Sequence, residues 1–311
     1  MPSQNRSVFE KDYLNLLNYI RKVRQTPRAL KELFNLDKEQ YLCPICLRPY
    51  SKKAISAKDL TAEHVPQKSI KGKEILLTCR KCNSESGHEF EGDLKEREKL
   101  KSFIKALNGE ENLEGRIKVE VTMGGQKINT HTHIKDGKID FKIPKDYNHP
   151  ANLEHIFDHL DEIYENQSWS KEKFNIQPDI RFSKRNIALS DLKTAYLASF
   201  ALLGYSYILN KEFDIIRQQI LNPKETLVQR IFLRLPKRLK RERKIISIEK
   251  PFKSITVQID ERMVFLPQVE NPVGSLGEIK NYLVQKNKEL NLSGTEFPWP
   301  KSLIMTLDFK D

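Results

Sequence analysis

The chain has 311 residues, of which 38% are hydrophobic and 31% are charged, and its formal net charge is +12. This composition can build a hydrophobic core, and it excludes a disordered or fibrous protein. The basic excess favours polyanionic partners such as DNA, RNA or an anionic membrane surface. A chain of this length is long for one compact domain and comfortable for two.

The N-terminal region predicts helices. The first 19 residues carry acidic side chains and lack a continuous apolar core, so we expect no secretory signal and a cytoplasmic protein. Apolar residues recur at three- and four-residue steps over residues 8–36, which is typical of amphipathic helices. Pro27 interrupts this pattern, and Thr26 is a candidate N-cap for a second helix that starts there.

The middle of the chain changes from a helical to an alternating pattern. After Cys82 we expect a helix that bends near Gly87 and Gly92 and is regular from there on. Apolar and polar residues alternate over residues 115–144, with glycine turns between the runs, and this predicts a three-stranded antiparallel meander. An amphipathic helix over residues 150–165 and a short strand near 177–182 follow.

The C-terminal part predicts apolar helices and then strands. Two helices, at 189–209 and 211–221, form the most apolar stretch of the chain. The run 194–209 is short for a bilayer span and contains a glycine, so we expect a buried helix and no membrane association. A helix is expected near 275–290, and alternating patterns predict strands within 245–251, 253–267 and 302–309.

The only four cysteines form two Cys-x-x-Cys pairs, Cys43 with Cys46 and Cys79 with Cys82. Two thiolates separated by two residues can wrap one metal, and two such pairs complete a tetrahedral site for zinc. Four thiolates leave no open position on the metal. The spacing therefore predicts a structural Zn²⁺, and any catalysis must use other residues.

The stretch AEHVPQKS, residues 62–69, lies between the two cysteine pairs. Phosphodiester hydrolysis needs an activated water and a charge sink, and a histidine such as His64 can take a proton from water at neutral pH. The adjacent Glu63 carries a carboxylate, a ligand type that suits Mg²⁺. Asn83 follows the last cysteine, at the start of a predicted helix whose N-terminus favours phosphate.

The Glu-His pair, followed by LLTCRKCN leading into a helix, resembles the HNH endonuclease family. The resemblance is to those members in which a four-cysteine zinc site brackets the catalytic hairpin, and it covers about 45 to 55 residues of this chain. It implies a ββα-metal fold, two strands and then a helix, that holds one catalytic divalent ion.

The resemblance implies a role for each matching residue. His64 would be the general base, and Glu63, where the family more often has Asp, would bind a catalytic Mg²⁺ or Mn²⁺. Asn83 would be a second ligand of that ion. His88 lies one residue past the usual spacing and could reach the metal or a phosphate. The position of the family's middle Asn, which orients the catalytic histidine, is occupied here by Glu74.

Other polar clusters have a functional and a purely structural interpretation. Lys68 and Lys71 could bind phosphate or belong to a solvated loop. The basic segment 234–244 is favoured as a nucleic-acid contact, and 21–31 is a weaker patch of the same kind. Two histidine pairs have the spacing of metal ligands but no evident third ligand, and we expect surface side chains there: His131 with His133, and His155 with His159.

We therefore predict an α+β protein with a zinc-stabilised ββα-metal module, an N-terminal helical segment and a C-terminal mixed α/β domain. The expected segments are a helical segment 1–40, the HNH module 41–106, a β-meander 107–150 and an α+β domain 151–311 for substrate binding or oligomerisation. The expected activity is metal-dependent hydrolysis of phosphodiesters, with DNA favoured over RNA as the substrate and an RNA-directed nuclease kept as an alternative.

The resemblance suggests a setting in restriction or anti-phage defence. A homodimer, or a protein partner in a defence complex, would fit such a role. The alternative is a non-catalytic zinc-ribbon protein that binds nucleic acid or protein, and the glutamate at position 74 is its best support.

Overall fold

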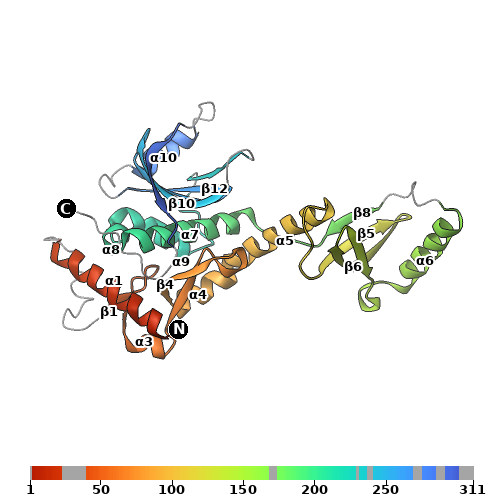
Figure 1. The fold of residues 1–311 in the computed structure, drawn as a ribbon, viewed down its shortest axis with the longest axis horizontal. Helices are drawn as coiled ribbons and strands as arrows, with labels where there is room; N and C mark the ends of the chain where they lie inside the picture. The colour runs from red at the N-terminus through yellow and green to blue at the C-terminus, as the bar shows by residue number, and fades with distance from the viewer. Residues whose placement is uncertain are drawn as a thin grey trace. The chain divides into compact units, whose positions relative to one another are not determined.

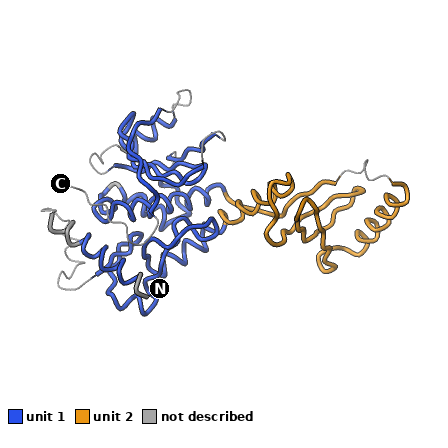
Figure 2. The backbone as a smooth tube through the Cα atoms, viewed as in Figure 1, with its two compact units in different colours: residues 1–92, 184–311 blue, residues 93–183 orange. Residues whose placement is uncertain are grey.

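The computed structural model describes residues 2–22, 40–167, 174–228, 231–236, 241–268, 275–284 and 291–300. The chain divides into two compact units, shown in Figure 2: unit 1 comprises residues 1–92 and 184–311, and unit 2 comprises residues 93–183. Unit 2 is therefore inserted into the sequence of unit 1.

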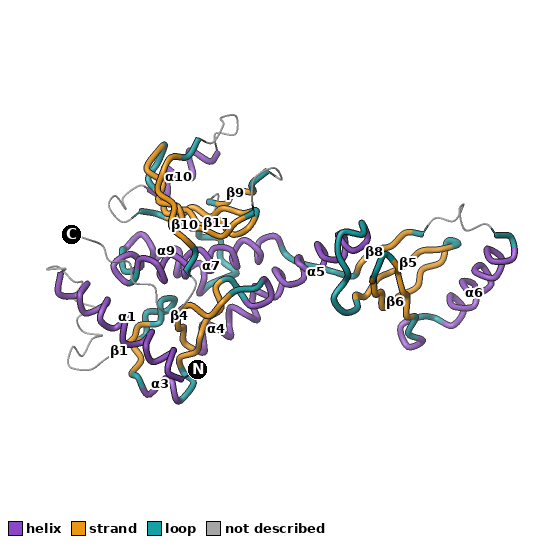
Figure 3. The backbone as a smooth tube through the Cα atoms, viewed as in Figure 1, coloured by secondary structure: helices purple, strands orange, loops and turns teal. Residues whose placement is uncertain are grey.

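Unit 1 contains helices and three small antiparallel sheets, coloured by type in Figure 3. The helical elements are α1 (Pro2–Lys22), α3 (Lys53–Ser56), η1 (Lys68–Ile70), α4 (Arg80–Ser86), the π-helix η2 (Gly87–Glu91), α7 (Lys184–Leu203), α8 (Tyr205–Ile208), η5 (Lys211–Phe213), α9 (Asp214–Leu221) and α10 (Ser275–Val284).

The strands of unit 1 pair with sequence neighbours for the most part. The first sheet is the hairpin β1 (Gln40–Leu42) and β2 (Pro49–Ser51), and the second is the hairpin β3 (Leu60–Val65) and β4 (Lys73–Cys79). The third has the order β13-β10-β11-β12-β9, with strands β9 (Phe232–Arg234), β10 (Glu242–Lys250), β11 (Ser254–Asp260), β12 (Arg262–Leu266) and β13 (Ser293–Pro298).

Helix α7 is the centre of unit 1. Its residues are buried without interruption from Leu189 to Phe200, including the charged Asp191 and Lys193. It contacts η2, β3 and β4 as well as β11 and β12, so it joins the β3–β4 hairpin to the five-stranded sheet (Figure 1). Among the described residues, no helix combines the length and apolar character that a membrane span requires.

Unit 2 has a core of its own, separate from that of unit 1. A four-stranded antiparallel sheet, in the order β7-β6-β5-β8, packs its apolar face against two helices. The elements are α5 (Gly92–Leu107), β5 (Ile117–Met123), β6 (Gln126–Lys135), β7 (Lys138–Lys142), η3 (Lys145–Tyr147), α6 (Pro150–Glu165) and β8 (Asn175–Pro178).

The predicted α+β class is confirmed, and the predicted meander corresponds to β5, β6 and β7. The structure differs in where the chain divides. Helix α6 and strand β8 belong to unit 2, because they complete its sheet and core, whereas the expected C-terminal domain began at residue 151. The predicted helix that starts at Pro27 and the predicted strand at 302–309 lie outside the described residues.

Asp12 on α1 gives unit 1 a pH-dependent stability. Burial raises the pKa of Asp12 from 3.8 to about 7, so the folded protein holds a proton that the unfolded chain releases. The contribution of Asp12 to stability is therefore greatest at acidic pH, and it falls by about 2 kcal/mol between about pH 5 and about pH 8. Asp12→Asn should remove this fall and raise the urea midpoint at about pH 8. Asp59→Asn, at an exposed aspartate, is the control and should leave the pH dependence intact.

Candidate functional site

The four cysteines converge at one point in unit 1. Cys43 and Cys46 lie in the turn between β1 and β2, Cys79 ends β4, and Cys82 lies in the first turn of α4. Their sulfur atoms all lie within 4.8 Å of one another, and the Sγ atoms of Cys46 and Cys79 are 3.8 Å apart. Sulfurs bound to a tetrahedral zinc at about 2.3 Å stand about 3.8 Å apart, so the cluster fits the predicted structural zinc.

Backbone amides support the sulfurs, as is usual for thiolate ligands of zinc. The amide of Cys79 donates to Cys43 Sγ at 3.4 Å, and the amide of Cys82 donates to Cys79 Sγ at 3.4 Å. The second of these bonds also makes Cys79 the N-cap of α4. The cysteine cluster therefore fixes both where strand β4 ends and where helix α4 begins.

The four thiols differ in their pKa. Hydrogen bonding with Cys43 lowers the pKa of Cys46 to about 7 and is the main cause of the low pKa of Cys79, which lies well below its ordinary value. Burial raises the pKa of Cys43, and hydrogen bonding with Cys43 raises that of Cys82. Zinc needs all four as thiolates, so its binding releases the protons that remain, and its affinity rises with pH.

His64 lies on β3, between the cysteine pairs, as the sequence predicts. It pairs across the hairpin with Glu74 of β4, and its Nε2 lies 3.8 Å from Glu74 Oε1. The register shifts between Glu63 and His64. The side chain of His64 is 29% exposed, and that of Glu74 is 37% exposed. The hairpin thus presents an imidazole to solvent with a carboxylate beside it.

The hairpin is tied to distant parts of unit 1. Arg243 of β10 donates to the carbonyl of Ile70 at 2.6 Å and to that of Lys71 at 3.3 Å. Gln67 donates to the carbonyl of Glu91 at 2.9 Å, and Trp299 donates to that of Val65 at 3.4 Å. The loop that follows His64 is therefore held by the C-terminal sheet and by η2, as well as by the cysteine cluster.

Glu63 is buried, with 3% of its surface exposed. Its Oε1 accepts a hydrogen bond from Lys193 Nζ at 2.9 Å, and its Oε2 accepts one from Thr78 at 2.6 Å. The same Lys193 ammonium donates to Glu91 of η2 at 2.9 Å. The resemblance predicts that Glu63 binds a catalytic metal. In the structure its carboxylate instead accepts hydrogen bonds from an ammonium and a hydroxyl.

The two other predicted metal ligands lie on α4 and η2. Asn83 uses its amide to hold strand β3, donating to Thr61 Oγ1 at 3.1 Å and to the carbonyl of Ala62 at 3.5 Å. His88 is exposed in η2, the π-turn that takes the place of the bend predicted at Gly87. No second group of three or more His, Cys, Asp or Glu side chains in the described part of the chain could hold a metal.

These contacts decide whether the predicted Mg²⁺ or Mn²⁺ fits. Such an ion needs several oxygen ligands, but both carboxylate oxygens of Glu63 already accept hydrogen bonds, one of them from a positively charged group. The amide of Asn83 is turned toward β3. In this arrangement the residues do not fit a divalent ion at Glu63, whereas the four cysteines do fit zinc.

The remaining candidates lie apart from the hairpin or have partners in the chain. His131, His133, His155 and His159 lie in unit 2, and they form no group of metal-ligand geometry there. In the basic segment 234–244, residues 237–240 lie outside the described residues, and Lys244 pairs with Glu296 at 2.6 Å. Of the segment 21–31, only residues 21 and 22 are described.

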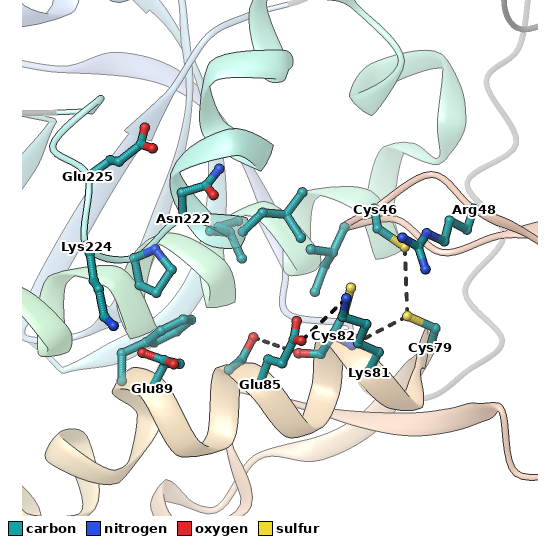
Figure 4. A pocket seen from close by; sticks show the side chains of 16 residues that line it. Cys46, Arg48, Cys79, Lys81, Cys82, Glu85, Glu89, Asn222, Lys224 and Glu225 are labelled. Carbon is teal, nitrogen blue, oxygen red and sulfur yellow. Dashed lines mark hydrogen bonds and ion pairs between the residues drawn. The ribbon is translucent and has the colours of Figure 1, made fainter.

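A cavity of about 690 Å³ lies beside the cysteine cluster (Figure 4). Cys46, Arg48 and Cys79 lie at one end, and Asn222 and Lys224 lie at the other. Glu85 and Glu89 of the α4–η2 helix also line it. Its lining includes none of the residues predicted to be catalytic, and its acidic and basic groups are mixed, so it does not extend the hairpin site.

Sequence reasoning missed Lys193, Glu91 and Thr78, the three residues that surround Glu63. A signal for Lys193 did exist. It is a lysine, two residues from Asp191, within the largely apolar helix 189–209, and a charge in such a helix is buried only with a partner.

Comparison with known proteins gave no match to a family model, to a curated protein or to a solved structure. The HNH resemblance therefore rests on the residues of the hairpin and the cysteine cluster.

Proposed function

We propose that this protein is an endonuclease of the HNH type, which hydrolyses phosphodiester bonds in nucleic acid and prefers DNA to RNA. The observation that carries the proposal is the pair formed by His64 and Glu74. A partly exposed imidazole lies 3.8 Å from a carboxylate, on a hairpin whose end is fixed by a site for zinc.

The proposed chemistry uses His64 as the general base. Since Nε2 faces Glu74, the other ring nitrogen, Nδ1, takes the proton from the attacking water. The Glu74 carboxylate then stabilises the imidazolium that forms, and it orients the ring in the way that the family's middle Asn does. In this proposal Glu74 takes the role that the family's middle Asn has.

Lysines at the closed end of the hairpin supply the positive charge that a nucleic acid backbone needs. Lys68, Lys71 and Lys73 are exposed there, within the segment that follows His64. A phosphate that approaches His64 would meet these ammonium groups. The net charge of +12 on the whole chain adds a general attraction for the polyanion.

The biological setting stays a prediction: a role in restriction or anti-phage defence, with a dimer or a protein partner.

A nicking assay tests the proposal. The zinc-loaded full-length protein is incubated with supercoiled plasmid, and separately with single-stranded RNA, in Mg²⁺, Mn²⁺ or EDTA. We expect plasmid nicking that His64→Ala lowers by about 10³-fold, because loss of a general base costs about 10²- to 10⁴-fold. Glu74→Gln should lower the rate by about tenfold and shift the pH profile. His155→Ala, at an exposed histidine of unit 2, is the matched control and should cleave normally.

A second candidate is a non-catalytic zinc protein that binds nucleic acid. The observation that favours it is the occupation of Glu63 by Lys193. On this view DNA binds with the same affinity to the wild-type protein and to His64→Ala, and no nucleic acid is cut under any of the metal conditions. That combination of results would remove the endonuclease proposal.

A further inference from the structure

The cluster around Lys193 joins four elements of unit 1 at one buried point. Lys193 comes from α7, Glu63 from β3, Thr78 from β4 and Glu91 from η2. The Lys193 ammonium lies 2.9 Å from one oxygen of each glutamate. The side chains of Lys193, Glu63 and Glu91 are 2%, 4% and 12% exposed, so the ammonium and the two carboxylates attract one another with little screening by water.

The ammonium stays charged in this position. Burial alone would lower the pKa of Lys193, but the two carboxylates and their hydrogen bonds outweigh burial and raise it. Burial raises the pKa of Glu91, an effect that Lys193 opposes and that the nearby Glu63 charge reinforces. Two carboxylates therefore face one cation. Carboxylates face a bound metal ion in the same way, but here the central cation is the Lys193 ammonium.

We propose that the Lys193 ammonium takes the place of a divalent cation between Glu63 and Glu91. A divalent ion at these oxygens would lie within a few ångströms of the ammonium, and like charges at that distance repel strongly where water is scarce. Lys193 is then the group that holds Glu63, and with it the adjacent His64, against η2 and α7. Lys193 is therefore a positioning residue for Glu63 and His64, and it extends to the hairpin from α7.

The identity of the cation between Glu63 and Glu91 does not depend on the proposed endonuclease activity. A nuclease that needs Mg²⁺ or Mn²⁺ would then have to bind it at oxygens other than those of Glu63. Failure of the nicking assay would leave the inference standing, and failure of the binding test below would leave the nicking result standing.

The test is Mn²⁺ binding, followed by electron paramagnetic resonance, to the zinc-loaded full-length protein. The wild-type protein should have no stoichiometric Mn²⁺ site that depends on Glu63, so Glu63→Gln should leave its Mn²⁺ binding unchanged. Lys193→Met should create one, at least tenfold tighter than any site of the wild type, and Mn²⁺ should raise the melting temperature of this variant alone. The double variant Lys193→Met with Glu63→Gln should lose the new site. Lys193→Arg keeps the positive charge and should gain none.

Two results would overturn the inference. One is a stoichiometric Mn²⁺ site in the wild-type protein that Glu63→Gln abolishes. The other is a folded Lys193→Met variant that binds Mn²⁺ no better than the wild type.

Should Lys193→Met fail to fold without metal, the triple variant with Glu63→Gln and Glu91→Gln separates charge from packing. Folding of this neutral variant supports the inference, because the glutamines remove the uncompensated charges. A triple variant that is as unstable as Lys193→Met overturns it.

Discussion

Replacing Cys79 by serine is expected to release the zinc and to unfold unit 1 at a much lower temperature. Cys79 is both a predicted ligand and the N-cap of α4, so its loss removes a thiolate and frees the junction between β4 and α4. A structural zinc contributes folding free energy directly. We therefore expect the melting temperature of unit 1 to fall by about 10 °C or more.

Unit 2 should survive this change. It contains no cysteine and has a separate core, so calorimetry of Cys79→Ser should show a shifted transition for unit 1 and an unshifted one for unit 2. Zinc content is measured on the same samples. Ser84→Ala, at an exposed serine of α4, is the matched control and should keep both the zinc and the melting temperature. Full zinc occupancy in Cys79→Ser would contradict the four-cysteine site.

Gly72→Ala is expected to destabilise unit 1 by about 3 kcal/mol, the upper end of the usual cost of overpacking. A Cβ at Gly72 would lie 1.3 Å from the carbonyl oxygen of Pro66 and 2.4 Å from its carbonyl carbon. Both atoms belong to the backbone, which cannot rotate away as a side chain can. The loop that follows His64 would have to open, and the contact of Arg243 with this loop would weaken.

The measurement is chemical unfolding of unit 1, together with plasmid nicking by the same variant. Gly277→Ala provides the control, because a Cβ at Gly277 in α10 meets no atom within 4 Å. Alanine in place of a helical glycine should stabilise the protein by about 0.5–1 kcal/mol. If Gly72→Ala unfolds at the wild-type denaturant concentration, the loop is not closed in the way described.

Patterns that are local in the sequence predicted most of the elements. The spacing of Cys43, Cys46, Cys79 and Cys82 was enough to predict the cluster, because each knuckle is set by a two-residue turn. Alternation over residues 115–144 was enough to predict the meander, because cross-strand pairs there come from sequence neighbours. The bend predicted near Gly87 appears as a π-turn over residues 87–91.

Contacts between segments that are distant in the sequence could not be predicted from it. Lys193 is 130 residues from Glu63 in the sequence, and Arg243 is 173 residues from Ile70. No periodicity or spacing links such pairs, since they meet only when α7 and the C-terminal sheet pack against the hairpin. For the same reason the insertion of unit 2 was not predicted: α6 and β8 join a sheet whose membership depends on tertiary pairing.

The sequence by itself therefore determined the cysteine cluster and the α+β class, because each follows from short-range spacing and alternation, whereas the pairing of His64 with Glu74 was seen only in the structure. Only the tertiary structure decided what Glu63 does. Burial of a carboxylate requires a compensating charge, and that charge is supplied by a lysine on a helix that packs across the hairpin. A residue predicted to bind a divalent ion is held instead by an ammonium of the protein itself.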